Sequence, residues 1–315
     1  MQNLIFSLNA TIPVFFVMAA GYLLRRIGIL NGGFVETLDK FNFRVTLPIL
    51  LITDLGRADF YQVWDTRFVL YCFFVTLASI AAAALLSLPA LKNRSERGEF
   101  IQASFRGSAA VLGIAFIQNI YGNAGMAPLM MLGAVPLYNV MTVVILSFTA
   151  PGSGGFDRQS IKKSMTKIVT NPLIIGIATG LLLSLLRIEL PLVVDKTLDQ
   201  FAVTATPLAL VSLGAGFEVK KAAARLKPAL LSSFIKLMLQ PAAFLPLAVY
   251  LGFQDAKMVA ILIMLGSPTT VSAYIMAKNM GHEGTLTSGA IVITTLFSSV
   301  SITFWLFVLR TMGLI

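Results

Sequence analysis

The sequence predicts an all-α integral membrane protein of ten transmembrane helices, built as two inverted five-helix repeats in which helices 4 and 9 are broken and cross. Three observations lead to this fold class. Of the 315 residues, 57% are hydrophobic and 12% are charged, which is more apolar surface than a soluble domain of this size can bury. Uncharged runs of spanning length recur along the chain, and glycines and prolines recur at one fixed spacing between its two halves.

Seven uncharged runs can each cross a bilayer, since a spanning helix needs about 20 residues. These runs are 4–24, 68–91, 168–186, 200–217, 237–254, 258–277 and 284–309. The uncharged run 107–156 is long enough for two helices, and the glycines and Asn123 within 121–125 favour a turn there. The tenth helix runs from Phe34 to about Gly56, with charged residues in its first turns.

Basic residues indicate which side faces the cytoplasm, because short cytoplasmic loops retain Lys and Arg. With the N-terminus outside, the inner loops hold 14 Lys and Arg, against 6 in the outer loops and C-terminus. We therefore expect a multi-pass protein of a bacterial-type cytoplasmic (inner) membrane with both termini outside. This topology accounts for the net charge of +10, so the expected partner is the lipid bilayer and no nucleic acid.

Two halves are indicated by a constant offset. A spacing of 159 residues pairs Pro13 with Pro172, Gly21 with Gly180, Pro48 with Pro207, Gly107 with Gly266, Ser108 with Ser267, Gly122 with Gly281 and Gly125 with Gly284. Residues 1–150 form the first repeat, 151–163 a cytoplasmic linker and 164–315 the second repeat. Because each half has an odd number of helices, the second half enters the membrane in the opposite sense.

A proline break within the ninth helix is the expected binding site. Residues 266–272 read Gly-Ser-Pro-Thr-Thr-Val-Ser, and a proline there removes a backbone donor and clashes with the preceding turn. Lipid cannot satisfy the freed backbone groups, so such a break faces protein or a water-filled cavity. The offset matches it with 107–115 in the fourth helix. We expect substrate contacts from Ser108, Gly113, Asn139, Ser267, Pro268, Thr269, Thr270 and Ser272. The alternative is that these small residues only pack helices together.

Charged residues inside predicted helices are the second place to look for function. Lys236 is either a charge beside an anion path or a partner of helix carbonyls opened by Pro241. Arg44 either ends a cytoplasmic charged turn or faces the cavity. We expect Arg106 at the membrane interface, at the inner end of the fourth helix, and His282 in a solvated turn.

Residue types and motifs that the sequence lacks disfavour several classes of function. Asp and Glu fall only near predicted helix ends, which disfavours a cation/proton exchanger built on a central carboxylate. The sequence contains no nucleotide-binding loop, metal-binding His/Cys spacing or hydrolase elbow. We therefore expect no enzyme activity, no metal site and no cofactor, with coupling to H⁺ or Na⁺ left open.

Four segments resemble the auxin efflux carrier family, which includes bacterial malate and malonate permeases and the plant PIN carriers. They are Leu-Pro-Ile-Leu-Leu at 47–51, Asn-Pro-Leu-Ile-Ile-Gly at 171–176, Thr-Pro-Leu-Ala-Leu at 206–210 with Gly214, and Ser-Pro-Thr-Thr at 267–270. The resemblance implies a scaffold of helices 1, 2, 6 and 7, a moving transport domain of helices 3–5 and 8–10, organic anion substrates and a homodimer. The sequence departs from the family where Ser108 replaces an asparagine and Ala115 a proline.

Together these observations predict a secondary active transporter, or carrier. We expect it to move a small organic anion across the cytoplasmic membrane by an alternating-access, elevator-like mechanism. Two alternatives are a sodium-coupled symporter of bile-acid type and a membrane sensor or channel without coupled turnover.

Overall fold

The computed structural model describes residues 2–57, 64–108, 117, 126–151, 165–166 and 168–315, with side chains from residue 12 onward. All the regular structure described in these ranges is helical, with one isolated β-bridge. The first half contains α1 (Gln2–Arg26), α2 (Gly32–Phe41), η1 (Asn42–Thr46), α3 (Leu47–Gly56), α4 (Thr66–Ala90), α5 (Arg94–Phe105) and α7 (Ala127–Thr149). The second half contains α9 (Pro172–Leu185), α10 (Leu192–Ala215), α11 (Val219–Ala224), α12 (Leu226–Phe234), η3 (Ile235–Leu239), α13 (Gln240–Tyr250), α14 (Asp255–Gly266), α15 (Ser272–Asn279) and α16 (Thr285–Thr311).

Five of the described helical segments are long and apolar enough to span a bilayer. They are Thr66–Ala90, Ala127–Thr149, Leu192–Ala215, Leu226–Tyr250 and Thr285–Thr311. The all-helical, multi-pass membrane class is therefore confirmed, whereas the count of ten helices stays a prediction. The predicted turn at 121–125 and residues 152–163 of the predicted linker lie outside the described residues.

Two predicted helices contain a π-helical turn immediately before a proline. η1 precedes Pro48, and η3 precedes Pro241. A proline inside a helix has no N–H group and its ring crowds the carbonyl four residues earlier, so the preceding turn widens. The helix continues on both sides of each turn, and Lys236 lies in the widened turn η3.

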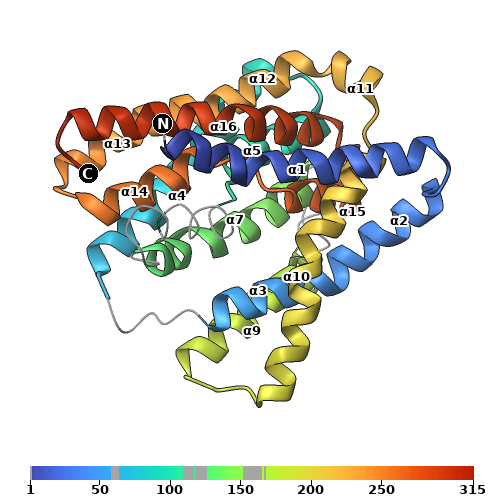
Figure 1. Cartoon of the computed structure of the whole chain (residues 1–315), viewed down its shortest axis with the longest axis horizontal. Helices are drawn as coiled ribbons and strands as arrows, with labels where there is room; N and C mark the ends of the chain where they lie inside the picture. The colour runs from blue at the N-terminus through green and yellow to red at the C-terminus, as the bar shows by residue number, and fades with distance from the viewer. Residues whose placement is uncertain (1, 58–63, 109–116, 118–125, 152–164, 167) are drawn as a thin grey trace.

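Helices from the two halves are packed against each other through glycines. α1 packs on α10, and α3 packs on α9 with α10 beside it (Figure 1). A Cβ atom built on Gly21 would lie 2.3 Å from the carbonyl oxygen of Val211, and one on Gly180 would lie 2.9 Å from that of Leu51. Only glycine permits such a close approach of two helix backbones.

The first and last helices of the chain have their terminal ends close together. The start of α1 and the end of α16 are at the same end of the molecule (Figure 1). The expectation that both termini lie outside stays a prediction.

The expectation of a solvated His282 is wrong, because the turn between α15 and α16 lies against the ends of α5 and α7. His282 is 4% exposed, with Nε2 3.0 Å from the carbonyl oxygen of Leu146 and Nδ1 3.1 Å from that of Ser95. Glu99 of α5 accepts hydrogen bonds from the backbone N–H groups of Gly284 and Thr287. A carboxylate at the start of α16 satisfies free N–H groups there. The turn therefore holds α5, α7 and α16 together.

We expect Gly214→Ala to destabilise the protein, because the added Cβ would lie 2.0 Å from the backbone oxygen of Met18 in α1. Overpacking of this kind costs ~1–3 kcal/mol. The measurement is the unfolding temperature in detergent. Gly289→Ala is the matched control, since its Cβ would meet Ala229 at an ordinary 3.4 Å. Equal unfolding temperatures for the two variants would contradict the close contact of α1 and α10.

Candidate functional site at the helix crossing

Two helices end inside the protein, at a place that is called the crossing below, and the residues that follow them meet. α5 ends at Phe105, and α14 ends at Gly266 with α15 starting at Ser272. The extended residues after the two helix ends run antiparallel, with Gly107 bridged to Thr269 and the N–H of Ser108 donating to the carbonyl of Pro268 at 2.9 Å. The proline break and the stretch that the 159-residue offset assigns to it are therefore in direct contact.

Side chains from other elements bond the carbonyl groups at the end of α5. Thr269 Oγ1 donates to the carbonyl of Ala103 at 2.9 Å, Gln240 Nε2 to that of Ser104 at 2.9 Å and Lys236 Nζ to that of Phe105 at 3.1 Å. The last carbonyls of a helix have no partner within it. Here they are buried away from water, and every one of these three is satisfied.

A cavity of about 90 Å³ lies beside the crossing. Its walls come from α3, α10, α7 and the two extended stretches. The lining residues are Leu47, Leu50, Leu51, Asp54, Arg106, Gly107, Ser108, Val135, Tyr138, Asn139, Ala205, Thr206, Ala209, Thr270, Val271 and Ser272. The wall from α3 and α10 is apolar except for Asp54 and Thr206, whereas α7 and the crossing contribute most of the polar groups.

The predicted site residues divide into three groups. Ser108, Asn139, Thr270 and Ser272 line the cavity. Ser267, Pro268 and Thr269 lie in the crossing itself, where Ser267 and Thr269 are buried and Pro268 bonds Ser108. Gly113 lies outside the described residues.

Arg106 is the principal cation of the cavity, and its expected interfacial position is wrong. Its side chain is buried, with 4% of the residue exposed, and its Nη2 donates to Asn139 Oδ1 at 2.7 Å and to Ser272 Oγ at 2.8 Å. The helix in this region begins at Arg94 rather than at Gly107, so Arg106 follows the end of a helix instead of preceding the start of one. Its position directly before the predicted crossing was the sequence signal that could have identified it.

The charged groups that line the cavity are the guanidinium of Arg106 and the carboxyl group of Asp54. The guanidinium of Arg106 lies beside the N-terminus of α15, where Ser272, the first residue of the helix, and the two residues before it line the same cavity. Helix N-termini carry a partial positive charge, and guanidinium groups bind carboxylates through paired hydrogen bonds. The hydroxyl groups of Ser108 and Ser272 add neutral donors.

Neither of the other two helical cations faces this cavity. Arg44 is exposed and lines a separate cavity of about 520 Å³ with Arg25, Lys40 and Lys278. Lys236 is fully buried and bonds carbonyls of the crossing. The structure therefore supports the carbonyl-neutralising interpretation of Lys236, although the carbonyls belong to α5 and α14 instead of its own helix.

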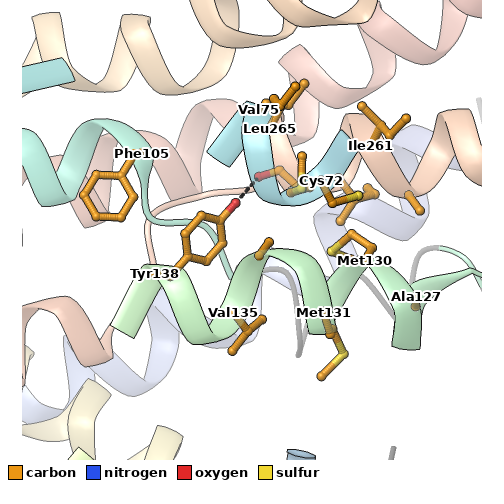
Figure 2. Close-up of a cluster of buried hydrophobic side chains, with 14 of the residues drawn as sticks. Cys72, Val75, Phe105, Ala127, Met130, Met131, Val135, Tyr138, Ile261 and Leu265 are labelled. Carbon is orange, nitrogen blue, oxygen red and sulfur yellow. Dashed lines mark hydrogen bonds between the residues drawn. The ribbon is translucent and has the colours of Figure 1, made fainter. Parts of the chain in front are cut away.

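Tyr138 connects the cavity to the core behind it. Its ring lies 5.9 Å from that of Phe105, between centroids, and its hydroxyl donates to the carbonyl of Met264 at 3.0 Å. Figure 2 shows Tyr138 at the edge of a cluster that includes Cys72, Met130 and Leu265. The polar wall of the cavity thus rests on a packed apolar core.

A cavity with a buried cation, between helix ends inside a multi-pass membrane fold, is typical of a membrane transport protein. A family model described as membrane transport protein (Mem_trans) matches residues 6–306. The chain belongs to this family, which confirms the predicted auxin efflux carrier relationship, and it is a transporter, not an enzyme.

Relatives match the chain along its length. A protein named "Putative malonate transporter" from Rhizobium meliloti is 25% identical over 316 residues, covering 95% of this chain and 95% of the relative. A protein named "Uncharacterized transporter" from Methanothermobacter thermautotrophicus is 23% identical over 311 residues, covering 96% and 98% respectively.

We expect the two neighbouring threonines of the crossing to respond differently to loss of their hydroxyl groups. Thr269→Val removes the donor to the carbonyl of Ala103, and leaving a buried acceptor unpaired costs ~1–3 kcal/mol. Thr270→Val changes the cavity wall and leaves the unfolding temperature close to that of the wild type. The measurement is thermal unfolding in detergent, and a larger loss in Thr270→Val would contradict the assignment.

Proposed function

We propose that the protein is a secondary active carrier of a small organic anion across the cytoplasmic membrane, and that the cavity at the crossing is its substrate site. The observation that carries this proposal is the buried guanidinium of Arg106 in the cavity wall. A buried cation is costly unless a partner balances it. Its hydrogen-bond partners are the neutral groups of Asn139, Ser272 and Met276. Asp54 lines the same cavity but forms no ion pair with Arg106 within 4.0 Å, so a substrate carboxylate would supply a directly bonded opposite charge.

The size of the cavity supports a small substrate. At about 90 Å³ it is well below the roughly 300–1,000 Å³ of pockets for drug-sized ligands. A short carboxylic acid matches both this volume and the charge of Arg106. The printed name of the Rhizobium meliloti relative, which mentions malonate, supports the same substrate class.

Contacts between helices support ten spans in two inverted repeats. The contact of Gly21 with Val211 and the contact of Gly180 with Ile52 involve pairs of residues that are each related by the offset of 159. Swapping the two halves thus exchanges the α1·α10 contact with the α3·α9 contact. A pseudo-twofold axis between the halves produces this exchange.

The cavity lies where the two proposed domains meet. α3 and α10 belong to the proposed scaffold of helices 1, 2, 6 and 7, whereas α7 and the crossing belong to the proposed transport domain of helices 3–5 and 8–10. A rigid movement of the transport domain along the scaffold would carry the polar wall from one side of the membrane to the other. We propose this elevator-like movement as the mechanism, in a homodimer as in the resembling family.

We expect Arg106→Gln to lower the uptake of labelled malonate into proteoliposomes at least ~10-fold at subsaturating substrate, since a hydrogen bond to a charged group contributes about 1.5–3 kcal/mol. Arg310→Gln is the matched control, because Arg310 is exposed at the end of α16. Saturable counterflow by the wild type would separate a carrier from a channel. Uptake by Arg106→Gln equal to that of Arg310→Gln would contradict the site, and ohmic currents without counterflow would contradict the carrier.

The proposed orientation is testable with single cysteines, because the native Cys72 is fully buried. In intact cells, a membrane-impermeant maleimide should label Lys196→Cys on the outer side and spare Lys92→Cys until the membrane is opened. Both lysines are exposed, so accessibility in the folded protein does not bias the comparison. The wild type reports labelling of Cys72. The opposite pattern would show that both termini lie inside.

A further inference from the structure

We propose that Lys236 is a built-in cation of the helix crossing, which takes the place that a coupling sodium ion would occupy, so that transport needs no sodium. This inference rests on the proposed carrier function. It concerns the back of the crossing: Lys236 itself does not line the cavity, although its neighbours Gly107 and Tyr138 do.

The Lys236 ammonium joins the ends of the two interrupted helices. The residue is fully buried, and its Nζ donates to the carbonyl of Phe105 at 3.1 Å and to the carbonyl of Met264 at 3.0 Å. Phe105 is the last residue of α5, and Met264 lies in the last turn of α14. Among the described residues no carboxylate oxygen lies within 4.0 Å of this ammonium.

The charge balance explains why a lone ammonium is stable there. Each helix C-terminus carries a partial charge of roughly −0.5, so two converging ends carry roughly −1. One ammonium balances them without a carboxylate. The face of the Tyr138 ring, with its centroid 6.0 Å from Nζ, adds a weak attraction.

The two acceptors are related by the repeat. Met264 and Phe105 are separated by the same 159 residues that relate the two halves. The ammonium therefore lies between equivalent carbonyl oxygens of the two repeats, and its single charge interacts with both helix ends. The residue that corresponds to Lys236 in the first repeat is Leu77, so only one repeat supplies a cation.

These carbonyl groups are also ligands for a small cation. Carbonyls at half-helix C-termini coordinate sodium at the crossings of some carriers. A third oxygen is nearby, since Ser267 Oγ is buried without a hydrogen-bond partner in the described structure. A Cβ built on Gly107 would lie 2.5 Å from Ser267 Oγ and 3.0 Å from Lys236 Nζ, so both groups contact the same glycine. Truncating the lysine would leave a small space surrounded by these oxygens.

The test is to remove the ammonium and supply a cation from solution. The purified wild type and Lys236→Ala are compared by thermal unfolding in sodium, ammonium and N-methylglucamine chloride at equal ionic strength. We expect the wild type to show no specific effect of sodium. Lys236→Ala should unfold at a lower temperature in N-methylglucamine chloride and be stabilised in a saturable way by sodium or ammonium, because a ligand that binds only the folded state raises its stability. Lys227→Ala, an exposed lysine of α12, is the control.

Uptake of labelled malonate gives the second measurement. Lys236→Ala should transport at least tenfold less than the wild type in N-methylglucamine chloride and recover in part with ammonium, an outcome that a purely structural role would not produce. Saturable stabilisation of the wild type by sodium would overturn the proposal, as would a Lys236→Ala protein that no cation stabilises. If Lys236→Ala does not fold, Lys236→Gln takes its place, since it removes the charge and leaves a smaller gap than alanine. Wild-type stability of Lys236→Gln in N-methylglucamine chloride would also overturn the proposal.

The unfolding measurement uses no substrate, so it distinguishes two kinds of failure. A wild type without malonate uptake but with the expected cation responses would contradict the proposed function alone. Normal uptake that requires sodium would contradict the role of Lys236 alone.

Discussion

A helix that ends inside a membrane protein leaves carbonyl groups that neither lipid nor water can bond. At the end of α5 this constraint is met by Thr269, Gln240 and Lys236, which come from the crossing and from the helix with the π-helical turn η3. Bonding of Gly107 and Ser108 to the stretch after α14 fixes the two segments against each other. The position of Arg106 follows from these bonds, because it joins the satisfied helix end to the bridged residues.

At the crossing, adjacent residues are either bonded to a helix end or exposed to the cavity. Thr269 donates into the end of α5, while Thr270, the next residue, lines the cavity. Extended backbone places successive side chains on opposite faces, so one short segment can both close a helix end and present a hydroxyl group to a ligand. Lys236 and Arg106 show the same separation, since one cation is bonded to carbonyls behind the crossing and the other lies in the cavity wall.

The sequence predicted the features that depend on local chemistry. Hydropathy gave the membrane class, Pro268 gave the break between α14 and α15, and the offset of 159 gave the stretch that meets it. The sequence-based predictions were wrong where buried polar residues bond one helix to another. The segment 94–106 contains charged residues and was expected to lie outside a span, yet Glu99 is buried at the start of α16 and Glu96 pairs with Arg225 at 2.5 Å. Both carboxylates find partners on distant elements, and the misplacement of Arg106 and His282 has the same cause.

The unequal walls of the cavity have a consequence for the energetics of the proposed movement. Leu47, Leu50 and Leu51 of α3 present an apolar surface, and the polar groups lie mainly on the opposite side. A substrate held by Arg106 and the hydroxyl groups around it would keep those bonds while it slides along the leucines, because non-directional apolar contacts exchange without loss of a directed bond. The leucine wall would then be a surface along which the bound substrate moves without losing hydrogen bonds. Substitutions in the polar wall alone could then change the substrate preference.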